Sequence, residues 1–201
     1  MAKAGVGSSF SLGPGLGSID RGSLDRLISF HGHLSAGLLI GLQMLALGRR
    51  LLSVEENERI HIVCETPNCL PDSFQVLAGT TTGNKSLTVR DTGKMAVTIT
   101  GHTPPGESAP GVRIILDAKK TEKFDKLHAW YMKTEKPSHE EVVQILKEAG
   151  DTVYSYEYVK VPVAGKIDKD VSICSICGES FIHMEKTDYC VDCARAKGEG
   201  M

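Results

Sequence analysis

The fold is decided by residues 34–52, LSAGLLIGLQMLALGRRLL, which contain the longest apolar run in the chain. From about residue 35 to residue 52 the apolar side chains cover almost every side of a helix, and a helix that is apolar all round lies in a protein core. Three glycines in it, Gly37, Gly41 and Gly48, each cost a helix about 1 kcal/mol relative to alanine. They therefore predict that a sheet, a second helix or a partner subunit approaches this helix closely.

The residues before this helix divide into a second helix and a tail. Apolar residues at helical spacing over residues 24–31 predict a helix whose N-cap is Asp20 or Ser23, and Gly32 interrupts it. The preceding residues are rich in glycine and serine and have no apolar pattern. We therefore expect residues 1–19 to form a flexible N-terminal arm.

The residues after the long helix alternate between short strands, turns and helices. The predicted strands are residues 59–65, 86–90, 94–100, 112–116 and 154–161, and the predicted helices begin at Pro71, Glu122 and Ser138. Residues 91–93, DTG, predict a hairpin between the second and third of these strands. Because strands and helices do not alternate strictly, the pattern favours an α+β fold, a mostly antiparallel sheet packed with helices, over residues 20–165.

Composition and charge exclude several classes of protein. Of the 201 residues, 41% are hydrophobic and 24% are charged, which is ordinary for a globular protein and excludes a disordered or collagen-like chain. The formal net charge of −2 encodes no general affinity for nucleic acid or anionic lipid. The apolar run is shorter than the ~20 residues that a membrane span requires, and no signal peptide is visible. We therefore expect a cytoplasmic protein with no membrane or nucleic-acid partner.

Two CxxC pairs near the C-terminus form the strongest motif in the sequence. Cys174 and Cys177 are followed, after 12 residues, by Cys190 and Cys193. The spacing lets both thiolates of each pair reach one ion, and four such ligands suit tetrahedral Zn²⁺. Four sulfur ligands leave no open coordination position. The motif therefore predicts a structural zinc in a small C-terminal domain, residues 166–201, of the zinc-ribbon or treble-clef class.

This C-terminal segment has too few large apolar residues to fold by burial alone, whereas zinc contributes ~10–16 kcal/mol of apparent folding free energy in zinc-finger peptides. Free or redox-active thiols and a rubredoxin-like iron site are the alternatives, and His183 is a substitute ligand that four cysteines make unnecessary. The segment contains five Lys or Arg and seven Asp or Glu. Because nucleic-acid binding is electrostatic first, this charge favours a protein partner, or a role as a cover for a site on the core.

Two histidines flank a glycine at the break between the first two predicted helices. Residues 30–37 read FHGHLSAG, and the glycine between His31 and His33 can turn both rings toward one point. Histidine is a common ligand for zinc, nickel, copper and iron. On the residues alone, one buried hydrogen-bonded histidine and one surface histidine is the simpler interpretation.

The same stretch resembles the signature of the FmdE family, which is typified by the FmdE subunit of formylmethanofuran dehydrogenase. That signature reads roughly His-Gly-His-x-Cys-Pro-Gly. The residues similar to the run that follows it in that family are 64–69 (CETPNC), 72–75 (DSFQ), 79–83 (GTTTG) and 91–94 (DTGK). Many members also carry the two CxxC pairs. The family's Cys-Pro is replaced by Ser35-Ala36 in this chain. The resemblance implies an FmdE-like core that begins near residue 20.

The resemblance also implies a core site that contains His31, His33 and Cys69 and holds a second metal of unspecified identity. Cys69 lies in a proline-bounded loop, where a ligand or reactive thiol can be presented, although an ordinary buried thiol is the alternative. The same three residues are the candidates for a catalytic role. Cys64 shares its strand parity with Ile62 and is predicted to lie in the core.

The implied function is a metal-binding FmdE-like protein that acts as an accessory subunit or a small metal-dependent catalyst in C1 or redox metabolism. The family is named after a methanogenic enzyme that reduces CO₂ onto methanofuran with molybdenum or tungsten. This chain has no iron–sulfur spacing beyond its cysteine quartet and no evident pterin site, so it cannot carry out that reaction by itself. The alternatives are a zinc-finger module that recognises a protein or nucleic acid without catalysis, and a scaffold in which both histidines only pack.

We also predict a homodimer, because closed twofold dimers are the commonest oligomers. The long helix is apolar on more sides than one sheet layer covers, and the few apolar residues of the zinc finger need a surface to bury against. A second copy of the chain can supply both surfaces. A finger that reaches the histidine motif of the partner would also close that site to water.

Overall fold

The computed structural model describes residues 9–104, 107–162, 169–183 and 187–198. The chain divides into two compact units. The core unit consists of residues 1–103 and 108–161, and the tail unit consists of residues 104–107 and 162–201.

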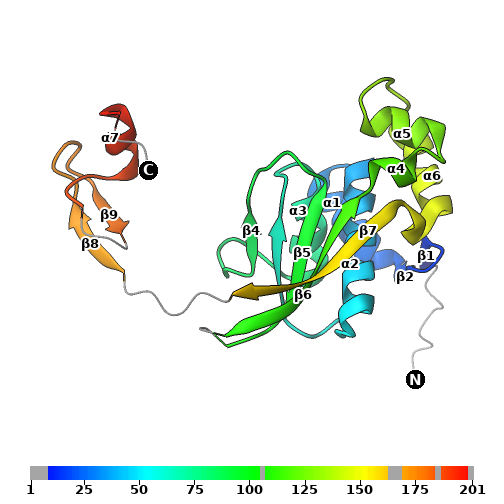
Figure 1. Cartoon of the computed structure of the whole chain (residues 1–201), viewed down its shortest axis with the longest axis horizontal. Helices are drawn as coiled ribbons and strands as arrows, with labels where there is room; N and C mark the ends of the chain where they lie inside the picture. Colours follow the sequence, from blue (N-terminus) through cyan, green and yellow to red (C-terminus); the bar gives the residue numbers. More distant parts are fainter. Residues whose placement is uncertain (1–8, 105–106, 163–168, 184–186, 199–201) are drawn as a thin grey trace. The chain divides into compact units, whose positions relative to one another are not determined.

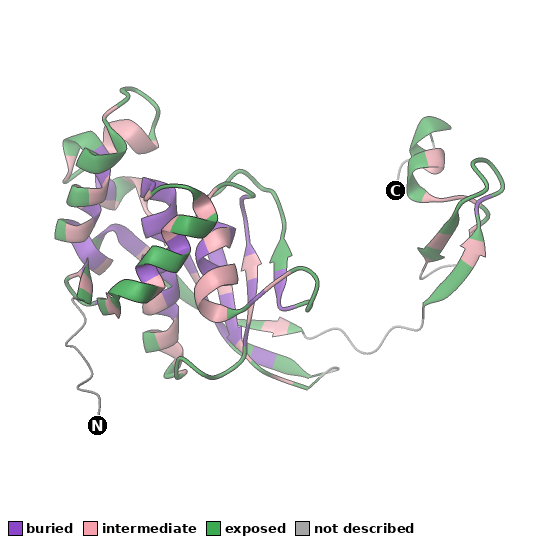
Figure 2. Ribbon diagram, turned by 180° about the vertical axis from the view of Figure 1, so that it is seen from behind, coloured by how far each residue is buried: buried purple, intermediate pink, exposed green. Residues whose placement is uncertain are grey.

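The long apolar segment forms helix α2 (Ala36–Leu52), which is buried along most of its length (Figure 2). Its glycines permit the close approach that the sequence predicts. A Cβ added to Gly41 would lie 2.9 Å from a carbonyl oxygen of helix α3 (Leu70–Ala78), and one added to Gly48 would lie 2.4 Å from Cδ1 of Ile99. The helix therefore packs directly against both a second helix and the central sheet.

Residues 9–20 form a β-hairpin. Its strands are β1 (Ser9–Gly13) and β2 (Gly17–Asp20), which pair antiparallel. Leu12 and Leu16 are buried in the core, and the buried Gln43 Nε2 donates a hydrogen bond to the Leu12 carbonyl oxygen (2.7 Å). The predicted flexible arm of residues 1–19 is therefore wrong for residues 9–19, because long-range contacts order a segment with no local pattern of its own. The first eight residues lie outside the described part of the chain.

Replacing Gly13 with alanine is expected to lower the free energy of unfolding by about 2 kcal/mol. Gly13 has φ 100°, and an added Cβ would lie 2.4 Å from the Lys147 carbonyl oxygen, so backbone strain and overpacking act together. Chemical denaturation of the full chain measures the loss. Gly17→Ala is the matched control, since Gly17 has φ 72° but no atom within 4 Å of the added Cβ. Equal losses in the two variants would contradict the docking of the hairpin.

The core sheet has five strands in the order β4-β3-β5-β6-β7 (Figure 1). These strands are β3 (Ile60–Cys64), β4 (Leu87–Val89), β5 (Ala96–Gly101), β6 (Ser108–Leu116) and β7 (Tyr154–Pro162). Strand β5 pairs antiparallel with β3 and β6, whereas β4 pairs parallel with β3. The predicted α+β fold with a mostly antiparallel sheet is confirmed.

The hairpin predicted over residues 91–93 is wrong, because β3 lies between the two strands that it would join. The connecting residues instead cross the end of β3. The Arg90 N–H donates to the Cys64 carbonyl oxygen (2.8 Å), and the Thr92 N–H donates to that of Glu65 (3.0 Å). Pairing with an earlier strand therefore overrides the local turn signal.

The remaining core helices are α1 (Arg21–His31), α4 (Ala118–Thr121), α5 (Asp125–Tyr131) and α6 (His139–Ala149), and a 3₁₀ helix (Gly150–Val153) follows α6. Of these helices, α6 packs against α2, whereas α1 packs against α3 and α5 packs against α6. A capping box begins α6, since the Glu141 N–H donates to the Ser138 hydroxyl (3.2 Å) and the Ser138 N–H donates to the Glu141 carboxylate (3.1 Å). Among the described residues, none of the helices is long and apolar enough to cross a lipid bilayer.

The tail unit combines a two-stranded antiparallel sheet with one short helix. These elements are β8 (Asp170–Ile173), β9 (Ser180–His183) and α7 (Val191–Ala196). Val171 on β8 lies directly opposite Ile182 on β9. The unit has little apolar burial of its own, which leaves the cysteines between and after the strands as its organising feature.

Candidate functional site

The four cysteines of the tail unit converge on one point. Cys174 follows β8, and Cys190 is the N-cap of α7. The Sγ atoms of Cys174, Cys177, Cys190 and Cys193 all lie within 4.8 Å of one another. Gly178 has φ 76°, a conformation that suits glycine, and it turns the chain directly after the first pair. The predicted quartet is therefore assembled as a set of four sulfur donors that can hold a metal ion.

The close packing of the quartet shifts the pKa values of its thiols in opposite directions. Backbone N–H groups of Cys177 and Cys190 donate to Cys174 and lower the pKa of its thiol to about 6, whereas a hydrogen bond with Cys190 raises the pKa of the Cys193 thiol to about 12. The Cys174 thiol therefore loses its proton more readily than the Cys193 thiol. A metal ion takes the place of the thiol protons, because metals bind cysteine as thiolate.

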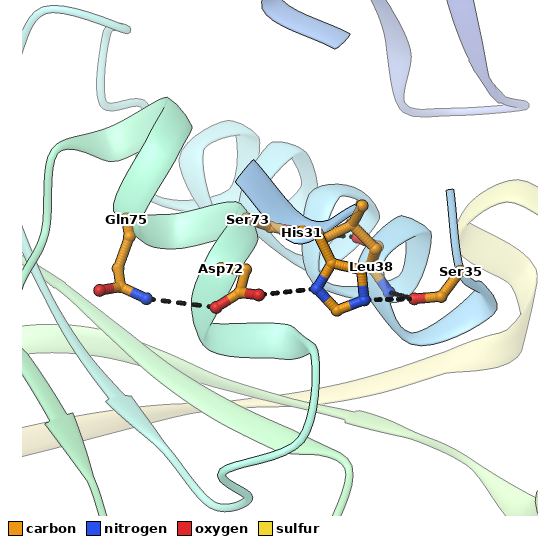
Figure 3. Close-up of polar contacts among 6 residues, drawn as sticks. All are labelled: His31, Ser35, Leu38, Asp72, Ser73 and Gln75. Carbon is orange, nitrogen blue, oxygen red and sulfur yellow. Dashed lines mark hydrogen bonds and ion pairs between the residues drawn. The ribbon is translucent and has the colours of Figure 1, made fainter. Parts of the chain in front are cut away.

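His31 is held between two polar side chains at the end of α1 (Figure 3). Its Nδ1 lies 2.7 Å from Oδ2 of Asp72, in the first turn of α3, and its Nε2 lies 3.3 Å from the Ser35 hydroxyl. The other oxygen of Asp72 accepts a hydrogen bond from Gln75 (3.3 Å). Gly32, at φ 100°, ends α1 directly after the histidine. The end of α1, the N-cap of α2 and the first turn of α3 therefore fix one imidazole ring.

The hydrogen-bond partners assign the tautomer of His31. The Asp72 carboxylate is an acceptor, so Nδ1 of the neutral ring carries the proton and Nε2 presents its lone pair. The Ser35 hydroxyl accepts from the Leu38 N–H (3.1 Å), as the N-cap of α2, and can donate to that lone pair. A histidine whose second nitrogen is held by a carboxylate is the usual arrangement of a metal-ligating histidine.

Two further histidines extend this site. The ring of His33 lies 5.3 Å from that of His31 and 5.6 Å from that of His139, measured between centroids. His33 and His139 are exposed, whereas His31 is half-buried. Sequence reasoning missed His139, the first residue of α6, because only the tertiary fold brings it to a motif more than 100 residues away. It also gave no role to Asp72 as the partner of His31.

Cys69 lies against the first turn of α2. It precedes α3 with φ 45°, which is unusual for a residue other than glycine. A Cβ added to Gly37 would lie 3.3 Å from the Cys69 Sγ, so this glycine makes room for the thiol. The half-buried Cys69 and the dyad of His31 and Asp72 therefore flank the same helix terminus.

In the described part of the chain, one group of three or more His, Cys, Asp or Glu side chains has ligand atoms that lie close together. That group is the tail quartet. His31, His33 and Cys69 do not converge in this way, and a metal shared by these three stays a prediction. The predicted core position of Cys64 is confirmed. Its side chain is buried, its thiol donates to the Thr66 carbonyl oxygen (3.2 Å), and burial raises its pKa to about 11.

Comparison with known proteins identifies the family. The model of the family described as "FmdE, Molybdenum formylmethanofuran dehydrogenase operon" matches residues 30–161, which is most of the core unit. This chain belongs to the FmdE family. The resemblance seen in the histidine motif and the downstream segments is thereby confirmed, and the matched region contains His31, His33 and Cys69.

The fold of this FmdE-family chain also matches a solved structure. A tungsten formylmethanofuran dehydrogenase FmdE-like protein from Syntrophus aciditrophicus superposes with a TM-score of 0.71 at 28% sequence identity, over 86% of this chain and 90% of that one. A curated relative from Archaeoglobus fulgidus, named "Probable S-adenosyl-L-methionine-binding protein", is 35% identical over 105 residues. That match covers 49% of this chain and spans 28% of the length of the relative.

Proposed function

We propose that this chain is a metal-binding FmdE-family protein in which the tail quartet holds a structural zinc ion. The observation that carries the proposal is the convergence of four Sγ atoms within 4.8 Å. Four thiolates favour zinc among the common metals, and they occupy every position of its tetrahedral shell, so the ion organises the tail unit and leaves no site for a substrate.

We further propose that the histidine cluster of the core is a second metal site, with His31, His33 and Cys69 as its candidate ligands. The dyad of His31 and Asp72 supports this proposal, because the carboxylate orients the ring and a metal could take the place of the Ser35 hydroxyl at Nε2. A metal there would supply Lewis-acid or redox chemistry. Because the chain belongs to the FmdE family, we propose that it is a cytoplasmic accessory subunit or small metal-dependent catalyst in C1 or redox metabolism. The match to the Archaeoglobus relative spans 28% of that protein, so the ligand in its name is not assigned to this chain.

Metal analysis of natively purified full chain, by plasma mass spectrometry, tests both sites. We expect one zinc per chain from the tail and a second metal from the core. Replacing His31 and His33 with alanine is expected to remove the second metal alone, and replacing all four tail cysteines with serine is expected to remove the first alone. A metal content that the histidine changes do not alter would contradict the core site.

Replacing Asp72 with asparagine is expected to weaken metal binding at the core site about 10–100-fold, because the ring loses the carboxylate that orients it. Competition with a chromophoric chelator measures this affinity on the full chain with the tail zinc in place. Gln75→Ala is the milder control, since Gln75 contacts Asp72 and not the histidine. The same affinity in wild type and Asp72→Asn would show that the dyad has no part in metal binding.

A second proposal concerns partners of the tail unit. Val171, Ile173 and Ile182 are 68%, 67% and 65% exposed, and the pairing of Val171 with Ile182 places them on one face of the small sheet. Exposed apolar side chains that gather on one face mark an interaction surface. We propose that this face binds protein, with a second copy of the chain as the partner, and not nucleic acid.

Sedimentation at micromolar concentration tests the homodimer. We expect a dimer mass and, in a structure of the dimer, a buried area above ~1,000 Å². Replacing Val171 and Ile182 with serine is expected to shift the equilibrium toward monomer, because it removes apolar area from the proposed interface. A monomer mass for the wild-type chain would overturn the dimer and leave a different protein as the partner to seek.

A further inference from the structure

A cavity of about 530 Å³ opens in the core unit, beside the histidine cluster. Its walls come from the loop before α3, the connection between β4 and β5, and the end of α5 with the segment that leads to α6. This volume lies within the range of ~300–1,000 Å³ that small-molecule sites occupy. His139 belongs both to this wall and to the histidine cluster, since its ring lies 5.6 Å from that of His33.

One wall of the cavity is aromatic. Trp130, near the end of α5, lines the cavity. Its side chain is half-buried and also packs against the hydrophobic core. The neighbouring Tyr131 is anchored, because its hydroxyl donates to the Leu116 carbonyl oxygen (3.1 Å). The indole of Trp130 is a large, flat apolar group in this wall, which favours a planar ligand.

The rim of the cavity carries charges of both signs. Lys133 and Lys136 contribute ammonium groups, and Asp91 and Glu135 contribute carboxylates. Within the described residues, none of these four takes part in an ion pair within 4.0 Å, although three of them are sequence neighbours. Asp91 uses one oxygen to accept from the Gly93 N–H (3.1 Å), and its other oxygen is available. Such a rim suits a ligand that carries both an anionic group and a hydrogen-bond donor.

The backbone at this rim is strained. Lys133 has φ 58°, a left-handed conformation that a lysine rarely adopts and that glycine adopts without cost. The turn that it makes directs residues 133–137 along the edge of the cavity. This unfavourable backbone conformation at a lysine that lines the cavity points to a use for its ammonium group.

We propose that this cavity is a binding site for a small planar aromatic molecule that carries a carboxylate and an amine. The ring stacks on Trp130, the carboxylate pairs with Lys133 and Lys136, and the amine donates to Asp91 or Glu135. A molecule bound there lies next to His139 and therefore at the edge of the histidine cluster. The proposal does not depend on a metal in that cluster.

The chain has a built-in reporter for this proposal, because Trp130 is its only tryptophan. Full-length protein labelled with 5-fluorotryptophan gives one ¹⁹F resonance, which we expect 6-amino-2-naphthoate to shift in a saturable manner. The corresponding carboxamide, which lacks the negative charge, is expected to bind about tenfold more weakly, as is expected for the loss of one charge-assisted hydrogen bond.

Two variants separate a binding role from a structural one. Lys136→Ala and Lys133→Gly are each expected to weaken binding about tenfold, while Lys133→Gly keeps or raises the melting temperature because it relieves the strained backbone. Lys123→Ala, an exposed lysine outside the cavity, is the control and should bind like wild type. No saturable shift at millimolar naphthoate, or equal affinity for acid and carboxamide, would overturn the proposal. Equal affinity in both lysine variants and the control would overturn it as well.

Discussion

Replacing Cys190 with serine is expected to release the tail metal and to unfold residues 169–198. The tail unit buries few apolar side chains, whereas zinc contributes ~10–16 kcal/mol of apparent folding free energy in comparable fingers. Cys190 also joins the two halves of the quartet, since its N–H donates to the Cys174 sulfur (3.4 Å) and it is the N-cap residue of α7. Hydrogen exchange of the full chain measures the result as lost protection in β8, β9 and α7.

Cys69→Ser is the matched control for this change, because it removes a thiol outside the quartet. It should leave the exchange of the tail unit unchanged. The core unit should keep its protection in both variants, since its core is formed by residues of its own. Tail protection that survives Cys190→Ser and chelation would contradict a metal-dependent fold.

Replacing Glu65 with alanine is expected to lower the free energy of unfolding by about 3 kcal/mol, the lower end of what the loss of one partner costs a buried ion pair. Glu65 is 2% exposed, and its carboxylate accepts two hydrogen bonds from Arg113 (2.6 and 3.0 Å). Without it, Arg113 keeps only the more distant Glu157 (3.5 Å). Glu157→Ala is the control and should cost less than ~1 kcal/mol, because that carboxylate is 64% exposed. Similar losses in the two variants would contradict the structural role of Glu65.

The same ion pair predicts how stability depends on pH. The hydrogen bond from Arg113 lowers the pKa of the Glu65 carboxyl below its ordinary value in the folded state. Its stabilisation is therefore complete above the unfolded-state pKa of about 4.3, and it is lost as the pH falls through the lower folded-state pKa. As the pH falls below about 4.3, the free energy of unfolding measured by denaturation should fall more steeply for wild type than for Glu65→Gln. If the free energy of unfolding depended on pH in the same way in both proteins, Glu65 would have no part in acid denaturation.

The elements that could be predicted from sequence are those whose signals are local. Helix α2 is such an element, because its apolar pattern and the Ser35 cap lie within the segment itself. The hairpin of residues 9–20 could not be predicted, since Leu12 and its neighbours are ordered by Gln43, a residue of a different element. The hairpin predicted at residues 91–93 is wrong for the same reason. The strands that these residues connect do not pair, because the tertiary fold places β3 between them.

The candidate sites divide along the same line. The tail quartet could be predicted in full, because its ligands come in two short motifs with metal-binding spacing. For the core site, the sequence indicated His31 and His33 but not Asp72 as the orienting carboxylate, nor His139 as a neighbour. Both omissions have one cause, since only the tertiary fold brings these two residues next to the histidine motif.

The claim that the tail quartet holds a structural zinc is tested most directly by zinc K-edge absorption spectroscopy. The full chain with His31 and His33 replaced by alanine leaves the tail as its metal site, so the spectrum reports that site alone. We predict a single shell of four sulfur atoms at ~2.3 Å from zinc. A shell dominated by nitrogen or oxygen would contradict a four-cysteine zinc site. So would a protein preparation that retains no zinc after incubation with the metal.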